Sequence, residues 1–205
     1  MAYDFKRLTD CLVRNLQQAY ATYEQRFPGH RLYTFGPYTS GEMSYFVPTA
    51  SSDLGLIEVV QKYKATPQYA EASEKDLALT LKWSPCDSPL HEAFEFDSTL
   101  HQAAEQLGQH LDEVFDQEEN AFDDDPDADD DVFASAVVEA QTAVCQALRI
   151  LDEDGLFGRG DARPLLNLWY GDQSDEAFVL LASALNPPEV VQRFQAELEE
   201  RAKLF

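Results

Sequence analysis

The clearest pattern along the chain is the recurrence of apolar residues at steps of three and four, the spacing that places them on one face of a helix. It predicts a helix over residues 4–27, which Pro28-Gly29 ends, and a stronger one over residues 133–151. Gly155 is placed to end the second helix in a left-handed conformation. The two apolar faces comprise Phe5, Leu8, Leu12, Ala19 and Tyr23, and Phe133, Val137, Ala140, Val144, Leu148 and Leu151.

Other helices are predicted where an apolar stripe follows a residue that favours a helix start. The expected starts are Asp53 for a helix over residues 54–63, Asp97 or Ser98 for one over about residues 100–114, Ser174 for the next, and Pro188 for the last, over residues 189–204.

Several stretches have the features of β-strands. Residues 31–38 and 42–47, rich in Tyr, Phe, Thr and Val, predict a β-hairpin that turns at Ser40-Gly41. Residues 77–83 alternate apolar and other side chains, which predicts a strand with one buried face. Residues 164–170 are apolar on both faces with one exception, which predicts a central strand.

Together these elements predict a single α+β domain over residues 1–205. Four strands are too few for two useful sheets. We therefore expect one small, mostly antiparallel sheet of about four strands, packed with five to six helices and interrupted by a long acidic loop.

The net charge excludes several classes of function. The chain has 205 residues, with 15 Lys and Arg against 38 Asp and Glu, for a net charge of -23. Such acidity argues against binding to nucleic acid or to an anionic membrane surface, since both need a basic face. The apolar fraction of 44% is too high for a wholly disordered chain.

About half of this charge lies in one segment: 12 of the 20 residues from 112 to 131 are acidic and none is basic. Because like charges repel, Asp is a poor helix former and Pro126 lacks an amide donor, we expect a disordered, solvated loop over residues 116–131. The candidate partner-binding residues in it are Asp123, Asp124, Asp125, Asp127, Asp129, Asp130 and Asp131.

Three roles for this loop stay open: solubilisation, weak binding of divalent cations, and docking of a basic protein. A calcium-binding loop of the EF-hand type that started at Asp123 would have Ala128 where Gly is needed and Ala134 where Glu is needed. The segment therefore does not predict a dedicated calcium site.

No set of residues predicts a reaction. Cys86, Asp87 and His91 could supply a nucleophile and a base, but they are crowded into one turn and nothing nearby would lower the pKa of the thiol. No two of the four histidines are four residues apart, as zinc ligands on a helix would be. The glycine-rich residues 155–160 follow a helix and lack the Lys-Ser/Thr of a phosphate loop. We expect no catalytic residue, metal or cofactor.

The cysteine pattern bears on the compartment. Cys11, Cys86 and Cys145 are an odd number and lie far apart, which favours reduced thiols. The first seven residues contain no apolar stretch of the kind found in a signal peptide. These two observations favour the cytoplasm.

Three stretches together resemble the bacterial domain-of-unknown-function family 4303. Residues 81–87 resemble its strand end with a basic residue followed by Trp-Ser-Pro. Residues 147–158 resemble its helix ending in Leu-Asp-x-x-Gly-Leu-Phe-Gly, and residues 185–194 its C-terminal Asn-Pro-Pro helix. The resemblance implies no established reaction. It suggests a likeness to small acidic bacterial proteins encoded beside toxins as immunity partners.

The leading hypothesis is a non-enzymatic bacterial protein-binding module, an immunity protein that neutralises a basic toxin domain. The alternative is a small-molecule-binding protein or a small enzyme. Its pocket would lie at the edge of the sheet, around Trp83, Asp87 and Trp169.

Overall fold

The computed structural model describes residues 3–91, 93, 97–124, 132–171 and 173–204. Its elements, in chain order, are α1 (Phe5–Arg26), β1 (Leu32–Thr39), β2 (Val47–Ser52), α2 (Asp53–Lys64), α3 (Glu74–Leu81), α4 (Ser98–Asp124), α5 (Val132–Glu153), β3 (Leu165–Leu166), β4 (Trp169–Tyr170), α6 (Asp175–Leu185) and α7 (Pro188–Ala202). Short 3₁₀ turns lie at Pro67–Tyr69, Pro85–Asp87 and Gly160–Ala162. The predicted α+β class is confirmed.

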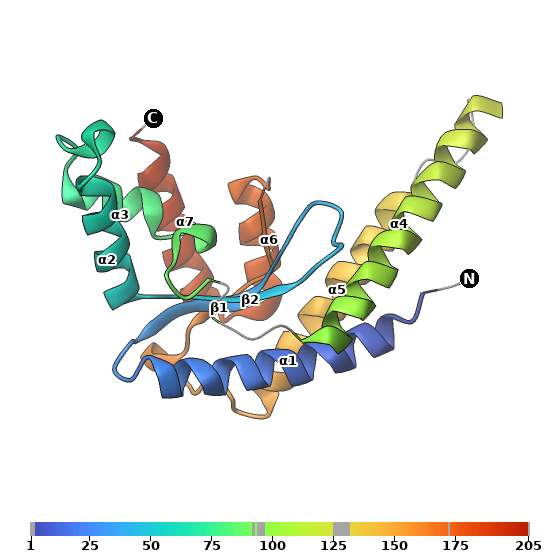
Figure 1. Ribbon diagram of the computed structural model, residues 1–205, viewed down its shortest axis with the longest axis horizontal. Helices are drawn as coiled ribbons and strands as arrows, with labels where there is room; N and C mark the ends of the chain where they lie inside the picture. Colours follow the sequence, from blue (N-terminus) through green and yellow to red (C-terminus); the bar gives the residue numbers. More distant parts are fainter. Residues whose placement is uncertain (1–2, 92, 94–96, 125–131, 172, 205) are drawn as a thin grey trace.

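A four-stranded mixed sheet lies at the centre of the molecule (Figure 1). β1 pairs antiparallel with β2 on one side, and parallel with both β3 and β4 on the other. The antiparallel ladder is the longest of these pairings. Because β2 is an edge strand, it tolerates Pro48, which lies opposite Pro37 of β1.

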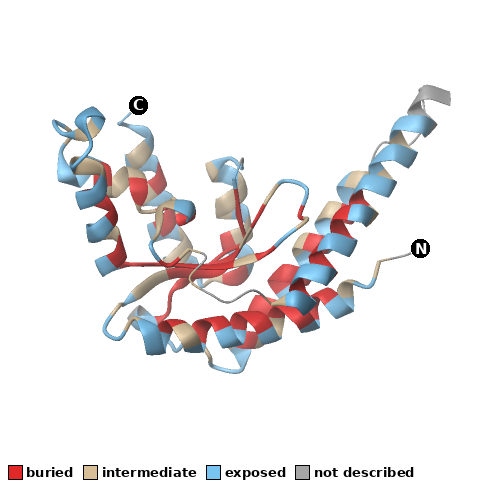
Figure 2. Ribbon diagram, viewed as in Figure 1, coloured by how far each residue is buried: buried red, intermediate tan, exposed pale blue. Residues whose placement is uncertain are grey.

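Helices cover both faces of the sheet (Figure 1). On one face α1, α4 and α5 enclose the main core, to which the sheet contributes Phe35 and Leu166, and the link between β3 and β4 contributes Leu168. On the other face α6 and α7 pack over Leu165 and Trp169, which point away from the main core. Figure 2 shows the corresponding buried stripes along α1 and α5.

α4 and α5 form a helical hairpin that extends away from the sheet (Figure 1). In Figure 2 its outer end is largely exposed, whereas its base packs against α1. We call this hairpin the acidic arm. Helix α4 continues to Asp124, so residues 116–124, which the sequence assigned to a loop, are helical.

Two strand predictions were wrong. Residues 77–83 were expected to form a strand, but residues up to Leu81 belong to α3, because Leu77 and Leu81 also fit one helical face and the Ser73 hydroxyl caps the helix by accepting from the Asp76 amide. The second hairpin strand lies at 47–52 instead of 42–47. The residues before it form a turn, in which Met43 has a φ of 52°.

Three of the predicted helix ends are confirmed, and the start of α2 is shifted by one residue. Gly155 has a φ of +83°, and the Leu156 amide reaches back to the Leu151 carbonyl, the arrangement of a Schellman motif. Ser174 caps α6 and Pro188 begins α7, as expected. The cap of α2 is Ser52 instead of Asp53, which is the first residue of the helix.

The predicted central strand over residues 164–170 is divided into β3 and β4. The Asn167 side chain explains the interruption, since its Oδ1 accepts from the Leu168 amide and its amide group donates to the Phe178 carbonyl. Among the described residues, no helix combines the length and apolar character that crossing a membrane requires.

Candidate functional site

Two of the three predicted pocket residues lie together. The rings of Trp83 and Trp169 are nearly parallel, with centroids 6.4 Å apart, in a cluster with Phe194 of α7. Trp169 is completely buried, and its Nε1 has no hydrogen-bond partner. The indole nitrogen of Trp83 donates to Glu197 Oε2 at 3.1 Å.

Asp87 lies apart from this pair. Its carboxylate accepts hydrogen bonds of 2.6 Å from the hydroxyls of Tyr63 and Ser84. The bond to Asp87 raises the pKa of Tyr63 to about 12. Asp87 lines a cavity of only about 10 Å³, whereas Trp83 lines a separate hollow of about 130 Å³; Tyr33 contributes to the walls of both.

The hollow beside Trp83 is lined by an unusual number of charged side chains. We call it the cationic pocket. Its charged residues are Arg31, Lys82, Arg163 and Arg193, with Asp53 and Glu197. Its apolar and aromatic walls are Leu32, Tyr33, Trp83, Leu165, Val190 and Phe194.

Lys82 is fixed by an ion pair and by two rings. Its Nζ lies 2.6 Å from Glu197 Oε2. The same nitrogen lies 5.5 Å from the centroid of the Tyr33 ring and 5.1 Å from that of Trp83, which are cation–π distances. Lys82 is therefore held in place against the aromatic wall of the pocket.

Arg163 is buried and held from several sides. Its guanidinium contacts both oxygens of Asp152, at 2.9 and 3.0 Å. It also donates to Asn186 Oδ1 at 2.8 Å and to the Leu185 carbonyl at 3.0 Å. The Asn186 side chain bonds in turn to both backbone polar groups of Leu166, which covers the outer edge of β3.

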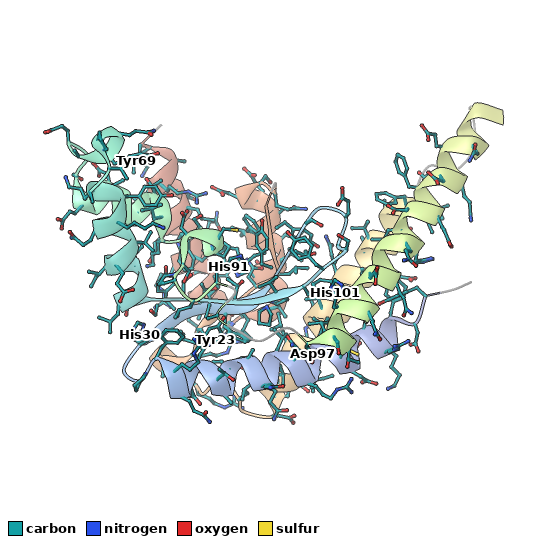
Figure 3. All side chains as sticks on the ribbon, viewed as in Figure 1. Tyr23, His30, Tyr69, His91, Asp97 and His101 are labelled. Atoms are coloured by element: carbon teal, nitrogen blue, oxygen red, sulfur yellow. The ribbon has the colours of Figure 1, made fainter. Side chains whose placement is uncertain are left out.

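A larger groove of about 580 Å³ lies along the end of α1 and shares Arg31 and Leu32 with the cationic pocket. Its walls are largely aromatic and apolar: Tyr20, Tyr23, Phe27, Leu156 and Phe157. Burial raises the pKa of Tyr23, whose hydroxyl lies 2.7 Å from the Leu90 carbonyl oxygen. His30, labelled with Tyr23 in Figure 3, lies 2.9 Å through Nδ1 from Ser52 Oγ.

Asp87 and His91, the candidate partners of Cys86, contact other polar side chains. Cys86 is exposed in the turn after α3. Both oxygens of Asp87 accept from Tyr63 and Ser84, and His91 Nδ1 lies 2.7 Å from the Thr49 hydroxyl. Within the described part of the chain, no three His, Cys, Asp or Glu side chains are grouped as ligands of one metal ion.

The acidic arm contains only part of the predicted partner-binding segment. The backbone of Asp123 and Asp124 belongs to the last turn of α4. The other candidates lie outside the described residues: Asp125, Asp127, Asp129, Asp130 and Asp131. The exposed carboxylates of α4 lie earlier in the helix: Glu105, Asp112, Glu113, Asp116 and Glu119.

The fold and its pockets define an α+β protein with a mixed four-stranded sheet, a cationic pocket and a helical arm. This chain belongs to the family described as domain of unknown function (DUF4303), whose sequence model matches residues 12–187. Comparison with curated proteins and with solved structures found no match.

The three stretches that carried this resemblance meet around the cationic pocket. The first contributes Lys82 and Trp83, and the third contributes Arg193 and Phe194. The second contributes Asp152, which holds Arg163. None of the pocket's four cations, Arg31, Lys82, Arg163 and Arg193, was among the predicted site residues. Residues so far apart in the chain show no common spacing in sequence.

Proposed function

We propose that this protein is a non-enzymatic binding module that docks a basic protein partner on its acidic arm. The observation that carries the proposal is the charge of α4, whose 27 residues include no Lys or Arg. Its exposed face presents Asp112, Asp116 and Glu119, among other carboxylates. A continuous negative field of this kind accelerates encounter with a basic surface.

Exposed apolar side chains on the same arm support a docking role. Phe115 is 51% exposed on α4, and Val132 and Val138 are 53% and 57% exposed on α5. The Phe115 ring packs edge-on against Phe133, with centroids 5.5 Å apart, so it is held on the surface at a fixed position. An aromatic anchor among charged residues is a common arrangement at protein interfaces.

We propose further that the partner is a toxin domain with a basic nucleic-acid-binding face, and that this chain acts in the bacterial cytoplasm as its immunity protein. An acidic arm would cover such a face by charge complementarity, in competition with nucleic acid. This part of the proposal rests on the charge of the arm and on the likeness to immunity proteins that the family resemblance suggests.

The test uses the purified product of the adjacent gene as the partner. Association is measured at about 50 and 500 mM salt for the native protein and for the triple variant Asp112→Lys, Asp116→Lys, Glu119→Lys. We expect association of the native protein to slow at high salt, and that of the variant to slow about tenfold or more at low salt.

A control variant separates position from net charge. Glu58→Lys, Glu71→Lys and Glu200→Lys make the same change of charge on exposed residues outside the arm. Equal losses in the two triple variants would reject the arm as the docking surface. Absence of a complex at both salt concentrations would reject the immunity function, and unchanged binding after deletion of residues 123–131 would exclude that segment from docking.

A further inference from the structure

The cationic pocket gathers positive charge on a molecule that is otherwise strongly negative. Four of the 15 Lys and Arg residues of the chain line a hollow of about 130 Å³. They come from four separate places: before β1, after α3, before β3, and within α7. The fold, and not a local run of sequence, brings them together.

Carboxylates are fewer than cations among the described residues that line this hollow. Asp53 and Glu197 stand against Arg31, Lys82, Arg163 and Arg193. Asp152, outside the set of lining residues, holds Arg163. The local balance of the lining side chains is thus the reverse of that of the whole chain, which carries -23.

The cations are positioned before any ligand arrives. Arg163 is 8% exposed and bonded to Asp152, Asn186 and a backbone carbonyl, so its orientation is set by the fold. Lys82 is set by Glu197. Arg193 is exposed on α7 and lines the same hollow, which places it where an incoming group would meet it.

The walls strengthen the effect of these charges. Trp83, Leu165 and Phe194 are buried and give the hollow part of its apolar lining. Charges beside such a surface are less screened than charges in open water. The volume corresponds to roughly four water molecules at about 30 Å³ each, enough for a single carboxylate or phosphate group.

We propose that the cationic pocket binds an oxyanion group, the carboxylate or phosphate of a small molecule. Arg193 contacts the anion, and Lys82 and Arg163 provide fixed positive charge behind it. Charge-assisted hydrogen bonds from guanidinium groups are the usual means by which proteins hold such groups. This site is independent of the docking surface proposed on the acidic arm.

The chain carries its own reporter for the test. Trp83 and Trp169 are its two tryptophans, and Trp83 both lines the pocket and donates its indole N–H to Glu197. The indole resonance of Trp83 is followed by NMR during titration with inorganic phosphate and, separately, with citrate. Sodium chloride at matched ionic strength is the control.

We expect a saturable shift of the Trp83 resonance with at least one of the two anions, and the anion that saturates identifies the group the pocket prefers. Arg193→Gln is expected to weaken binding about tenfold or more. Arg14→Gln, on the exposed side of α1, makes the same change of charge away from the pocket and should leave binding unchanged.

Glu197→Gln provides a change in the opposite direction. It removes an opposing carboxylate while keeping the size of the side chain, so binding should tighten. Shifts with both anions that do not saturate, or that match those with chloride, would overturn the proposal. Equal affinities of the native protein and Arg193→Gln would also overturn it.

Discussion

Asp152 and Arg163 are joined by two parallel contacts, from Nε to Oδ1 at 2.9 Å and from a terminal guanidinium nitrogen to Oδ2 at 3.0 Å. Through this pair the end of α5 is tied to the start of β3. Because Asn186 accepts from the same guanidinium, the end of α6 is tied to it as well. One buried cation thus connects three elements that surround the sheet.

Removal of the Asp152 carboxylate should destabilise the fold. Asp152→Ala leaves a guanidinium whose side chain is 6% exposed without its anionic partner. We expect the free energy of unfolding to fall by about 2 to 3 kcal/mol, below the range for a fully buried pair because the Asp152 side chain is 30% exposed. Urea denaturation measures this, with Asp154→Ala, at an exposed position nearby, as the control. Equal stabilities of the two variants would show that the pair is not structural.

Gly36 is required by the close approach of β1 to residue 167. A Cβ atom at this position would lie 1.8 Å from the Asn167 carbonyl oxygen. Gly36→Ala should therefore force the strands apart and lower the free energy of unfolding by about 3 kcal/mol or more. Gly41→Ala, where an added Cβ meets nothing within 4 Å, should change stability by less than about 0.5 kcal/mol. Thermal unfolding of the two variants side by side tests this, and equal stabilities would contradict it.

Glu118 of α4 caps α5 from the neighbouring helix. Its Oε2 accepts from the Phe133 amide at 2.7 Å, one of the amides that have no partner within α5. Glu118→Ala should lower the free energy of unfolding by about 1 kcal/mol, as loss of an N-cap does, and lower the melting temperature by about 2 to 4 °C. Glu119→Ala changes the charge equally on the exposed face. If both variants melt alike, the cap contributes nothing measurable.

Acid should weaken the start of α4. Burial alone would raise the pKa of Asp97. Hydrogen bonds from the backbone amides of Leu100 and Thr99 to its carboxylate outweigh that effect and hold the pKa below its ordinary value. A carboxyl whose pKa is depressed in the folded state contributes stability above the unfolded pKa of about 4, and this contribution is lost as pH falls through the folded pKa. Figure 3 labels Asp97 at the first turn of α4.

Asp97→Asn keeps an acceptor for the cap but cannot titrate. It should therefore lose less stability than the native protein between pH 7 and pH 3, as followed by urea denaturation at each pH. Asp112→Asn, on the exposed face of the same helix, controls for the change of charge. An acid sensitivity of Asp97→Asn equal to that of the native protein would contradict the role assigned to this carboxylate.

The long helices could be predicted because packing and local preference agree in them. The apolar face predicted for α1 includes Leu8, Leu12 and Tyr23, all of which are buried. The strand prediction for residues 77–83 was wrong because the spacing there fits two structures. Leu77, Leu79 and Leu81 fit the period of two of a strand, while Leu77 and Leu81 alone fit the step of four of a helix. The cap at Ser73 was the local feature that favoured a helix.

The helical extension of α4 through residues 116–124 could not be predicted from charge. Repulsion between carboxylates favours a loop, but contacts between helices oppose it. Phe115 packs on Phe133, and Glu118 caps α5. In both contacts the partner is Phe133, which lies beyond the acidic segment in sequence, so only the folded arrangement discloses it.

The candidate site was predicted in part. Trp83 lines the cationic pocket, but the four cations that define its charge come from residues 31, 82, 163 and 193, which share no spacing. Local sequence discloses a helix end such as the one that follows Asp152. It does not disclose which elements meet across the sheet, because that depends on strand order.

The order of the strands has a consequence for synthesis of the chain. β1 pairs with β3 across a large separation: the Thr34 hydroxyl donates to the Leu165 carbonyl 131 residues further along. On the ribosome, one edge of β1 therefore stays unpaired until residues 165 and 166 have been translated. A nascent chain that stalls before residue 165 presents an open strand edge, the kind of surface that aggregates and engages chaperones.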